Sequence, residues 1–153
     1  MTPEEKIVAL GFVLPAPLPP RFSYIPYRRV GDLLYLAGHG PRLPDDTYRL
    51  GKITRRQQID DAYADAQLTA LNMLATIKSA VGELSRVTAF VKVLGLVNAS
   101  PTFTSHPQVI NGCSDLLVNV FGEAGKHPRS AIGVSSLPNG MSVEIEAIVQ
   151  VSS

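Results

Sequence analysis

The chain has 153 residues with 14 Lys and Arg against 13 Asp and Glu, so its formal net charge at pH 7 is +1. This balance argues against a nucleic-acid-binding protein, because such proteins neutralise phosphates with a marked positive excess. Hydrophobic residues make up 45% of the chain, which predicts a single domain with a sizeable core over residues 1–153.

A single cysteine, Cys113, excludes a disulfide within the chain and fits a reducing compartment. The first residues do not resemble a secretory signal, and the early apolar stretch Ile7–Leu14 is too short to span a bilayer. The sequence therefore predicts a cytoplasmic protein with no membrane partner. Charged residues make up 18%, below the usual share of about 25%, and so apolar a surface weakly indicates an oligomer interface.

A short helix is predicted at the N-terminus. Thr2 can cap it, with Pro3 at its first position and Glu5 three residues after the cap, and Gly11 would end it. The proline-rich segment 15–20 then forms a stiff, extended connector. Residues 1–20 are therefore expected to be a helix and a connector that belong to the same domain.

Two strands follow at 21–29 and 32–38, with a turn at 30–32. The second contains the unbroken apolar run Leu33–Leu36, which is typical of a buried strand. A polar loop at 41–53 comes next.

The clearest element is a long helix. Thr54 and Gln57 have the spacing of a capping box at its start. Apolar side chains recur every 3.6 residues from Ile59 to Val81, and Gly82 suits the C-terminal cap.

The strand predicted at 87–97 carries apolar residues on both faces. One face is expected to hold Phe90, Leu94 and Leu96, and the other Val91 and Val93. A second amphipathic helix begins near Pro107 and ends at Gly122 or Gly125.

The last strands are predicted at 130–134 and 143–151, joined by a turn that contains Asn139 and Gly140. The order is then β-β-α-β-α-β-β after the N-terminal helix, which describes an α+β fold with a mixed sheet and two helices packed on one face. The other face is left uncovered. Because the strand at 87–97 is apolar on both faces, we expect self-association through the uncovered side.

No residue pattern in the sequence indicates a metal or cofactor site. His39, His106 and His127 have no close His or Cys spacing, so no metal site is expected. No glycine-rich phosphate loop follows a strand in the required order, and no cofactor is predicted. Cys113 lies on the apolar face of the second helix, where packing is its expected role.

Arg129 and Glu144 are the candidates for chemistry. Arg129 begins a strand whose same-face neighbours, Ala131 and Gly133, are small and leave room beside its guanidinium. A guanidinium holds a carboxylate through two parallel hydrogen bonds, so this position suits a ligand site. Glu144 lies on the next strand, on the face away from the core. An ordinary ion pair between the two residues, or a contact between subunits, would explain the same pattern.

The register of the last two strands decides whether Arg129 meets Glu144. A two-residue turn at Asn139 and Gly140 would set Arg129 opposite Gln150. A turn centred nearer residues 136–137 would set it opposite Glu144.

Several segments between about Tyr24 and Val151 carry a family resemblance. The most specific comprises Arg129-Ser130, Leu137-Pro138 and Val143–Ala147, and weaker ones are Gly31–Gly38, Leu71–Leu74, Ala80–Gly82 and Arg86–Val93. Together they resemble the Rid family of reactive-intermediate deaminases, also called YjgF-like proteins and often labelled endoribonuclease L-PSP.

This resemblance implies a chorismate-mutase-like fold and a homotrimer with three clefts between its subunits. It also implies two catalytic residues: Arg129 grips the carboxylate of the substrate, and Glu144 assists water. The substrate-binding positions that it implies are Tyr24, with Tyr27 as a close rival, Gly38, Asn111 and Arg129.

The chain departs from the family pattern at several points. Ala131 stands where many members have cysteine, and Ala37-Gly38-His39 replaces the usual Ser-Gly-Gln. The chain is also longer, with an added N-terminal helix and a longer segment between Asn111 and Arg129. It therefore resembles a divergent subgroup.

Three functions follow as hypotheses. The resemblance implies hydrolytic deamination of small enamine or imine (2-imino acid) metabolites to 2-keto acids and ammonia, with no cofactor. The second hypothesis is a binding module that holds a small carboxylate metabolite in the same clefts without turnover. The third is the ribonuclease activity that the family label suggests; the near-neutral charge and the lack of a histidine pair at nuclease-like spacing count against it.

Overall fold

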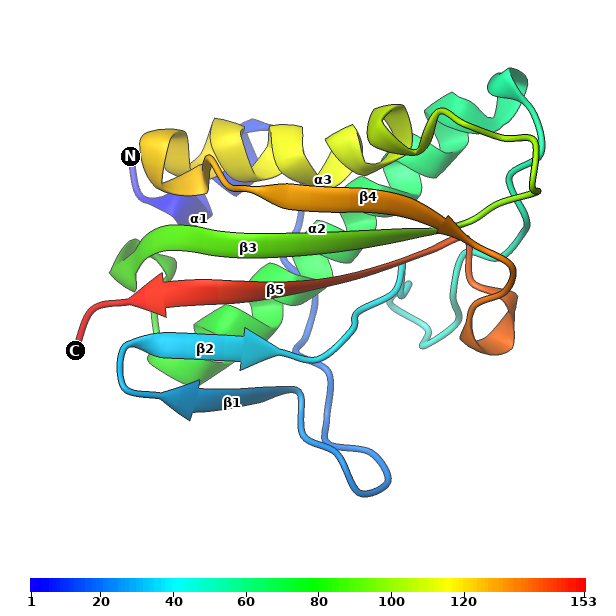
Figure 1. Ribbon diagram of the computed structural model, residues 1–153. Helices are drawn as coiled ribbons and strands as arrows, with labels where there is room; N and C mark the ends of the chain where they lie inside the picture. The colour runs from blue at the N-terminus through cyan, green and yellow to red at the C-terminus, as the bar shows by residue number, and fades with distance from the viewer.

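A five-stranded sheet runs through the molecule, with its strands in the order β1-β2-β5-β3-β4 (Figure 1). In this computed structural model, which describes all 153 residues, β3 and β4 are parallel and every other neighbouring pair is antiparallel. The predicted fold class and element order are confirmed. The helices and strands are α1 (Pro3–Ala9), β1 (Tyr27–Val30), β2 (Leu33–Leu36), α2 (Ile59–Val81), β3 (Val87–Asn98), α3 (His106–Phe121), β4 (Arg129–Val134) and β5 (Val143–Val151).

Local signals set the helix ends where the sequence predicted them. Thr2 caps α1, because its hydroxyl accepts from the Glu5 backbone N–H at 3.1 Å and the Glu5 carboxylate accepts from the Thr2 N–H at 2.7 Å. Gly82 ends α2 with φ at +90°, in the left-handed region that glycine adopts without strain.

The start of α2 lies later than predicted, and the residue that caps it differs by one position. A short 3₁₀ turn at Arg56–Gln58 precedes the helix. Gln58, and not Gln57, reaches back, and its side-chain oxygen accepts from the Thr54 N–H at 2.8 Å. The extra tight turn moves the capping side chain along the chain by one position.

The first strand begins later than predicted. Residues 21–26 form a loop with one isolated bridge between Arg21 and Tyr24, and β1 starts at Tyr27. Phe22 has φ at +55°, a left-handed conformation that a strand cannot contain.

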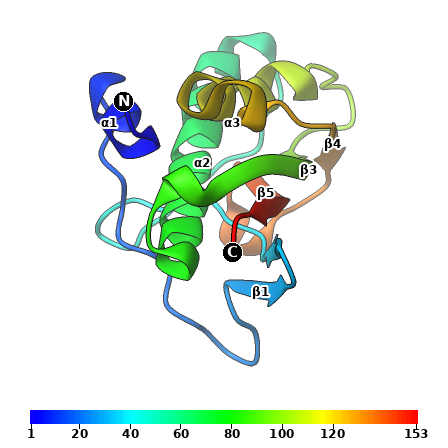
Figure 2. The ribbon, with the colours of Figure 1, turned by 90° about the vertical axis from the view of Figure 1, so that its left-hand side faces the viewer.

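Both long helices pack on one face of the sheet, and α1 packs against α3 (Figure 2). Two glycines allow the close approach. A side chain at Gly112 of α3 would overlap the backbone carbonyl of Tyr63 in α2, and one at Gly95 of β3 would meet Ile110 of α3 at 2.7 Å. α2 is the longest helix with 23 residues, and none of the helices is long and apolar enough to cross a membrane.

The predicted hairpin between the last two strands is wrong. β3 lies between β4 and β5, so that Arg129 pairs with Val93 of β3 and Glu144 pairs with Leu96 of β3. Both predicted registers, with Arg129 opposite Gln150 or opposite Glu144, are therefore excluded. Residues 135–142 connect β4 to β5 by crossing the end of β3 and do not form a tight turn. The connection can be this short because strands two places apart in a sheet are only about 10 Å from each other. The parallel pairing of β3 with β4 is instead set by the α3 crossover.

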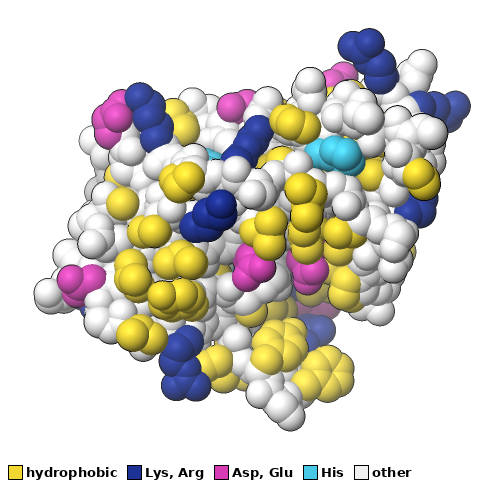
Figure 3. Space-filling model, viewed as in Figure 1, with side chains coloured by type: hydrophobic (Ala, Val, Ile, Leu, Met, Phe, Trp, Pro, Cys, Tyr) yellow, Lys and Arg dark blue, Asp and Glu magenta, His cyan; other side chains and the backbone are white.

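The face of the sheet opposite the helices is uncovered in the chain, as predicted (Figure 3). Side chains that alternate onto it include Tyr35, which is 43% exposed, and Ile132, which is 48% exposed. The register places Leu96 between Glu144 and Ile132 on the same face. Apolar side chains therefore surround the carboxylates there. Self-association through this face stays a prediction.

Phe90 was predicted to share a face of β3 with Leu94 and Leu96, but it lies on the opposite face. The pairing of β3 with β5 shifts register between Phe90 and Lys92, and this bulge turns the side chain toward the helices. Phe90 is 2% exposed, and its ring packs edge-on against Phe121 with the centroids 5.3 Å apart.

We predict that Gly112→Ala destabilises the protein although alanine is the better helix former. The new methyl group would overlap the Tyr63 carbonyl and force α3 away from α2. Overpacking of this kind costs about 1–3 kcal/mol, which outweighs the ~1 kcal/mol gained in helix propensity. The free energy of unfolding from denaturant titration measures the result.

The control is Asn119→Ala, an exposed position on the same helix, which should be neutral or slightly stabilising. A free energy of unfolding that rises in Gly112→Ala would show that the two helices do not pack this closely.

Candidate active site

A cavity of about 510 Å³ opens beside Gly38 and brings together three of the predicted site residues. Its walls come from the loop before β1, the loop after β2, α2 and the turn before β5. Tyr24, Gly38 and Glu144 all line it. The other lining residues are Leu18, Arg21, Phe22, Ala37, His39, Gly40, Arg42, Tyr48, Asn72, Pro138, Asn139 and Met141.

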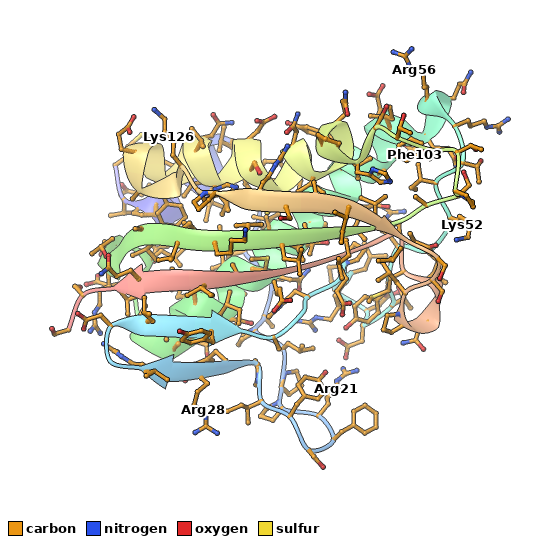
Figure 4. The ribbon with its side chains drawn as sticks, viewed as in Figure 1. Arg21, Arg28, Lys52, Arg56, Phe103 and Lys126 are labelled. Carbon is orange, nitrogen blue, oxygen red and sulfur yellow. The ribbon has the colours of Figure 1, made fainter.

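The two candidate tyrosines occupy different places. Tyr24 is 44% exposed and lies at the cavity, on the loop that also carries Arg21 (Figure 4). Tyr27 starts β1 and packs against the hydrophobic core. Tyr24 is therefore the one that can contact a molecule in the cavity.

The Glu144 carboxylate lies against the backbone of Gly38. A Cβ at Gly38 would be 2.7 Å from Oε1 of Glu144 and 2.9 Å from its carboxyl carbon. Burial raises the pKa of Glu144, and the like charge of Glu146 raises it further. A carboxyl group with a raised pKa takes up and releases protons more readily near neutral pH.

His39 fixes the strand-end loop on which Gly38 lies. Its backbone N–H donates to Ile145 at 2.8 Å, and its carbonyl accepts from Ile145 at 2.9 Å. Its ring Nδ1 donates to the Ala37 carbonyl at 2.7 Å, so Nε2 accepts from the Thr76 hydroxyl at 2.8 Å. Burial lowers the pKa of His39, and the ring is a neutral link between the loop and α2.

Arg129 lies elsewhere, between β4 and α3. Its Nη1 donates to the Ser114 hydroxyl at 2.9 Å and its Nη2 to the Pro107 carbonyl at 3.3 Å. Asn111 falls between Pro107 and Ser114 at helical spacing, so it lies on the same face of α3 as these two residues. Arg129 forms no ion pair in the chain, and its positive charge has only neutral partners.

The predicted residues thus form two separate groups. Tyr24, Gly38 and Glu144 are at the cavity, whereas Arg129 lies on the edge strand β4 and Asn111 on α3. The side chain of Arg129 points to the helix face and that of Glu144 to the uncovered face. An ion pair between Arg129 and Glu144 within the chain, one of the alternatives raised by the sequence, is therefore wrong.

Sequence reasoning missed two buried polar residues in the cavity. Arg42 is 9% exposed and was expected to lie in a polar loop; Asn72 is 3% exposed and lies on α2. The one available signal for Asn72 was an amide within the apolar run Leu71–Leu74 of a buried helix. Cys113, in contrast, is fully buried as predicted, and burial raises its pKa to about 12.

A family model described as "YjgF/chorismate mutase-like, putative endoribonuclease" matches residues 4–144. The chain belongs to this family. A curated family relative, protein TCP17 of Trypanosoma cruzi, is 37% identical over 144 residues, which cover 94% of this chain and 90% of that protein.

Solved structures agree with the family assignment. A protein of unknown function from Agrobacterium tumefaciens is 37% identical with a TM-score of 0.90, covering 98% of this chain and 92% of its own. A "putative endoribonuclease" from Shewanella oneidensis is 31% identical with a TM-score of 0.92, covering 99% of this chain and 100% of its own. RidA from an Antarctic Psychrobacter is 25% identical with a TM-score of 0.62, covering 91% and 96%. The closer match to the first two supports a divergent subgroup of the family.

We predict that Gly38→Ala displaces the Glu144 carboxylate while the fold is retained. The new methyl group would come within 3 Å of a flexible side-chain end, so the cost is that of an off-rotamer side chain, about 0.5–1.5 kcal/mol. In a Glu144→Ala background the same substitution should cost less, because the clashing group is gone. Denaturant unfolding of the two single variants and the double variant measures this coupling.

Glu146→Ala is the matched control background. The three atoms nearest to the added methyl group all belong to Glu144, so removing Glu146 should leave the cost of Gly38→Ala unchanged. Equal costs in all three backgrounds would contradict the contact between Gly38 and Glu144.

Proposed function

We propose that this protein hydrolyses small 2-imino acids, formed from enamines, to 2-keto acids and ammonia in clefts between the subunits of a homotrimer. The observation that carries the proposal is the unpaired charge of Arg129. A guanidinium that is held in place by Ser114 and Pro107, with no carboxylate partner in the chain, is available to bind the carboxylate of a ligand.

The residues divide the reaction between them. Arg129 holds the substrate carboxylate with two parallel hydrogen bonds and thereby fixes the position of the imine carbon. Glu144 accepts a proton from a water molecule as the water oxygen bonds to that carbon. That proton passes to the imine nitrogen, which gives a carbinolamine. Glu144 then transfers the carbinolamine hydroxyl proton to the same nitrogen, so that the carbon–nitrogen bond breaks, ammonia leaves and the oxygen becomes the carbonyl group. One positioned acid–base group contributes about 10²–10⁴ in rate.

The environment of Glu144 supports its role. Its raised pKa, caused by burial and by Glu146, makes the carboxylate a better proton acceptor than a fully solvated one. The carboxylate lies close to the Gly38 backbone, and Tyr24 lines the same cavity.

The positions of the two residues support a cleft between subunits. Arg129 and Glu144 are on opposite faces of one sheet, so one site can contain both only if they come from different chains. Arg129 is at the edge strand β4, where another subunit can approach it. The apolar side chains on the uncovered face, among them Ile132 and Tyr35, are suited to burial against a second copy.

The histidines do not favour ribonuclease chemistry. His39 is buried and neutral between Ala37 and Thr76. His127 is held between Ser114 and Gly125, and burial lowers its pKa. His106 lines another cavity, so no two histidines face one site within the chain.

We predict that Arg129→Ala lowers kcat/KM for imines generated in situ by an amino-acid oxidase about 10–100-fold, the loss expected for charge-assisted hydrogen bonds worth about 1.5–3 kcal/mol. Release of 2-keto acid and of ammonia measures the rate. Lys126→Ala is the control: this exposed cation, near the end of α3, is paired with Glu123 (Figure 4), and its loss should change nothing.

Equal rates for wild type and Arg129→Ala would overturn the assignment of Arg129. Stabilisation of the protein by small carboxylates that is lost in Arg129→Ala, without product from any imine, would instead identify a binding module.

We further predict that two inactive variants restore activity when they are mixed. Arg129→Ala subunits supply an intact Glu144, and Glu144→Gln subunits supply an intact Arg129. After unfolding and refolding together in equal amounts, about one quarter of the sites in a ring of subunits would contain both residues. The recovered rate is compared with that of each variant refolded alone. No recovery, with mixed oligomers present, would show that the site does not combine the two residues from different chains.

A further inference from the structure

The side chain of Asn72 carries a hydrogen-bonding atom that the fold does not use. Asn72 is 3% exposed and lines the 510 Å³ cavity beside Glu144. Its Nδ2 donates to the backbone carbonyls of Arg42 and Leu68, each at 3.0 Å. Its Oδ1 has no donor from the protein, and it is the one buried side-chain polar atom in the chain of which this is true.

The orientation of the Asn72 amide is fixed by its partners. Both are carbonyl oxygens, which only accept hydrogen bonds, so the NH₂ group must face them and the oxygen must face the other way. Oδ1 is thus an unused hydrogen-bond acceptor, held rigidly on α2 in a residue that lines the cavity. A buried acceptor without a donor is costly, and a ligand that carries a donor would remove that cost.

Arg42 provides the complementary group. Its backbone carbonyl accepts from Asn72, and the residue also lines the cavity. The guanidinium donates to Asp46 at 2.7 Å and to the Ala16 carbonyl, which leaves further N–H groups, because a guanidinium has five. The Asp46 carboxylate pairs with Arg42 at 2.7 Å and also with Arg21 at 3.9 Å. A ligand group near Asn72 therefore has one acceptor and additional donors within its surroundings.

A primary carboxamide matches this pair of residues. Its NH₂ group donates to Oδ1 of Asn72, and its oxygen accepts from Arg42. A carboxylate would be repelled by Oδ1, and an ammonium group would be repelled by Arg42. Cavities of about 300–1,000 Å³ accommodate ligands of drug size, so there is room for a side chain beyond the reacting imine carbon.

We propose that Asn72 and Arg42 form a subsite for the substrate side chain, and that the preferred substrates are 2-imino acids whose side chain ends in a carboxamide. The inference rests on the proposed function, since it adds specificity to the same cavity that contains Glu144. Asn72 and Arg42 select the substrate, and the reacting atoms lie at Glu144.

The first test needs no variant. Imines are generated in situ from asparagine, aspartate and leucine, which share one shape and differ in the end group, and from glutamine, glutamate and methionine. We expect kcat/KM for the carboxamide imine of one of these sets to exceed that of its apolar counterpart by about 10–100-fold, the discrimination that an otherwise unpaired buried acceptor provides. The carboxylate imine should also be disfavoured. Equal kcat/KM values within both sets would overturn the subsite.

The second test removes the acceptor. Asn72→Leu should lower kcat/KM for the carboxamide imine by about 10–100-fold relative to that for the apolar imine, so that the carboxamide preference is lost. Thr69→Val is the control: Thr69 is a buried α2 residue whose hydroxyl bonds within the helix to Asp65 and does not line the cavity. A carboxamide preference that survives in Asn72→Leu would overturn the assignment to Asn72.

A binding measurement separates this inference from the proposed function. Succinamate, succinate and 4-methylpentanoate are stable probes that share a carboxylate at one end and differ at the far end. If no imine is turned over but succinamate binds at least tenfold more tightly than the other two, and Asn72→Leu abolishes the difference, the subsite stands and the deaminase activity fails. Turnover of imines without any carboxamide preference would leave the activity and overturn the subsite.

Discussion

The double pairing of β3 is the constraint on which the arrangement of the site depends. This strand pairs with β5 along one edge and with β4 along the other, from Val93 to Asn98 in the parallel pair. It thereby separates the strand of Arg129 from the strand of Glu144. Because the register also fixes which face each side chain takes, the pairing sends Arg129 toward α3 and Glu144 toward the uncovered face. In the proposed function, this geometry is the reason why one site would take the two residues from two chains.

Small residues on the helix side and a pinned loop on the site side complete the arrangement. Gly95 and Gly112 let α3 approach both the sheet and α2, and this holds Pro107 and Ser114 where Arg129 can reach them. At the other end of the sheet His39 ties its loop both to β5 and to α2. The loop cannot move without breaking these bonds, so the Gly38 backbone is a rigid wall beside Glu144.

Features that depend on neighbouring residues could be predicted from the sequence. The Thr2 cap, the 3.6-residue period of α2 and its end at Gly82 are signals contained within a few turns of chain. The pairing of strands that are distant in the sequence could not be predicted from such local signals. A turn-like Asn139-Gly140 pair suggested a hairpin, but nothing local reveals that α3 carries β4 to the far edge of β3 and leaves residues 135–142 to cross it. The bulge that turns Phe90 inward is likewise set by pairing with β5 and not by alternation along β3.

The candidate site shows the same difference between features set by neighbouring residues and features set by long-range packing. The motif resemblance selected Gly38 and Glu144, which the structure brings into contact, and also Arg129 and Asn111, which it places at β4 and α3. Which residues share a cavity depends on long-range packing, so Asn72 and Arg42 had no sequence signal strong enough to select them. Their proposed role could be inferred only from the packing, in which α2 passes behind the loop after β2 and buries an amide whose oxygen has no partner.

Electrostatics connect the two groups in the proposed trimer. Covering the open face with a second chain would remove water from Glu144 and raise its pKa beyond the effect already produced by burial and by Glu146. The guanidinium of Arg129 from the neighbouring chain acts in the opposite direction, because a nearby positive charge favours the carboxylate form. A bound substrate carboxylate neutralises that guanidinium and withdraws its effect. Binding of substrate would therefore raise the proton affinity of Glu144 at the moment when a proton must be taken from water. In the proposed trimer, the placement of Arg129 and Glu144 on different chains would thus couple substrate binding to proton transfer.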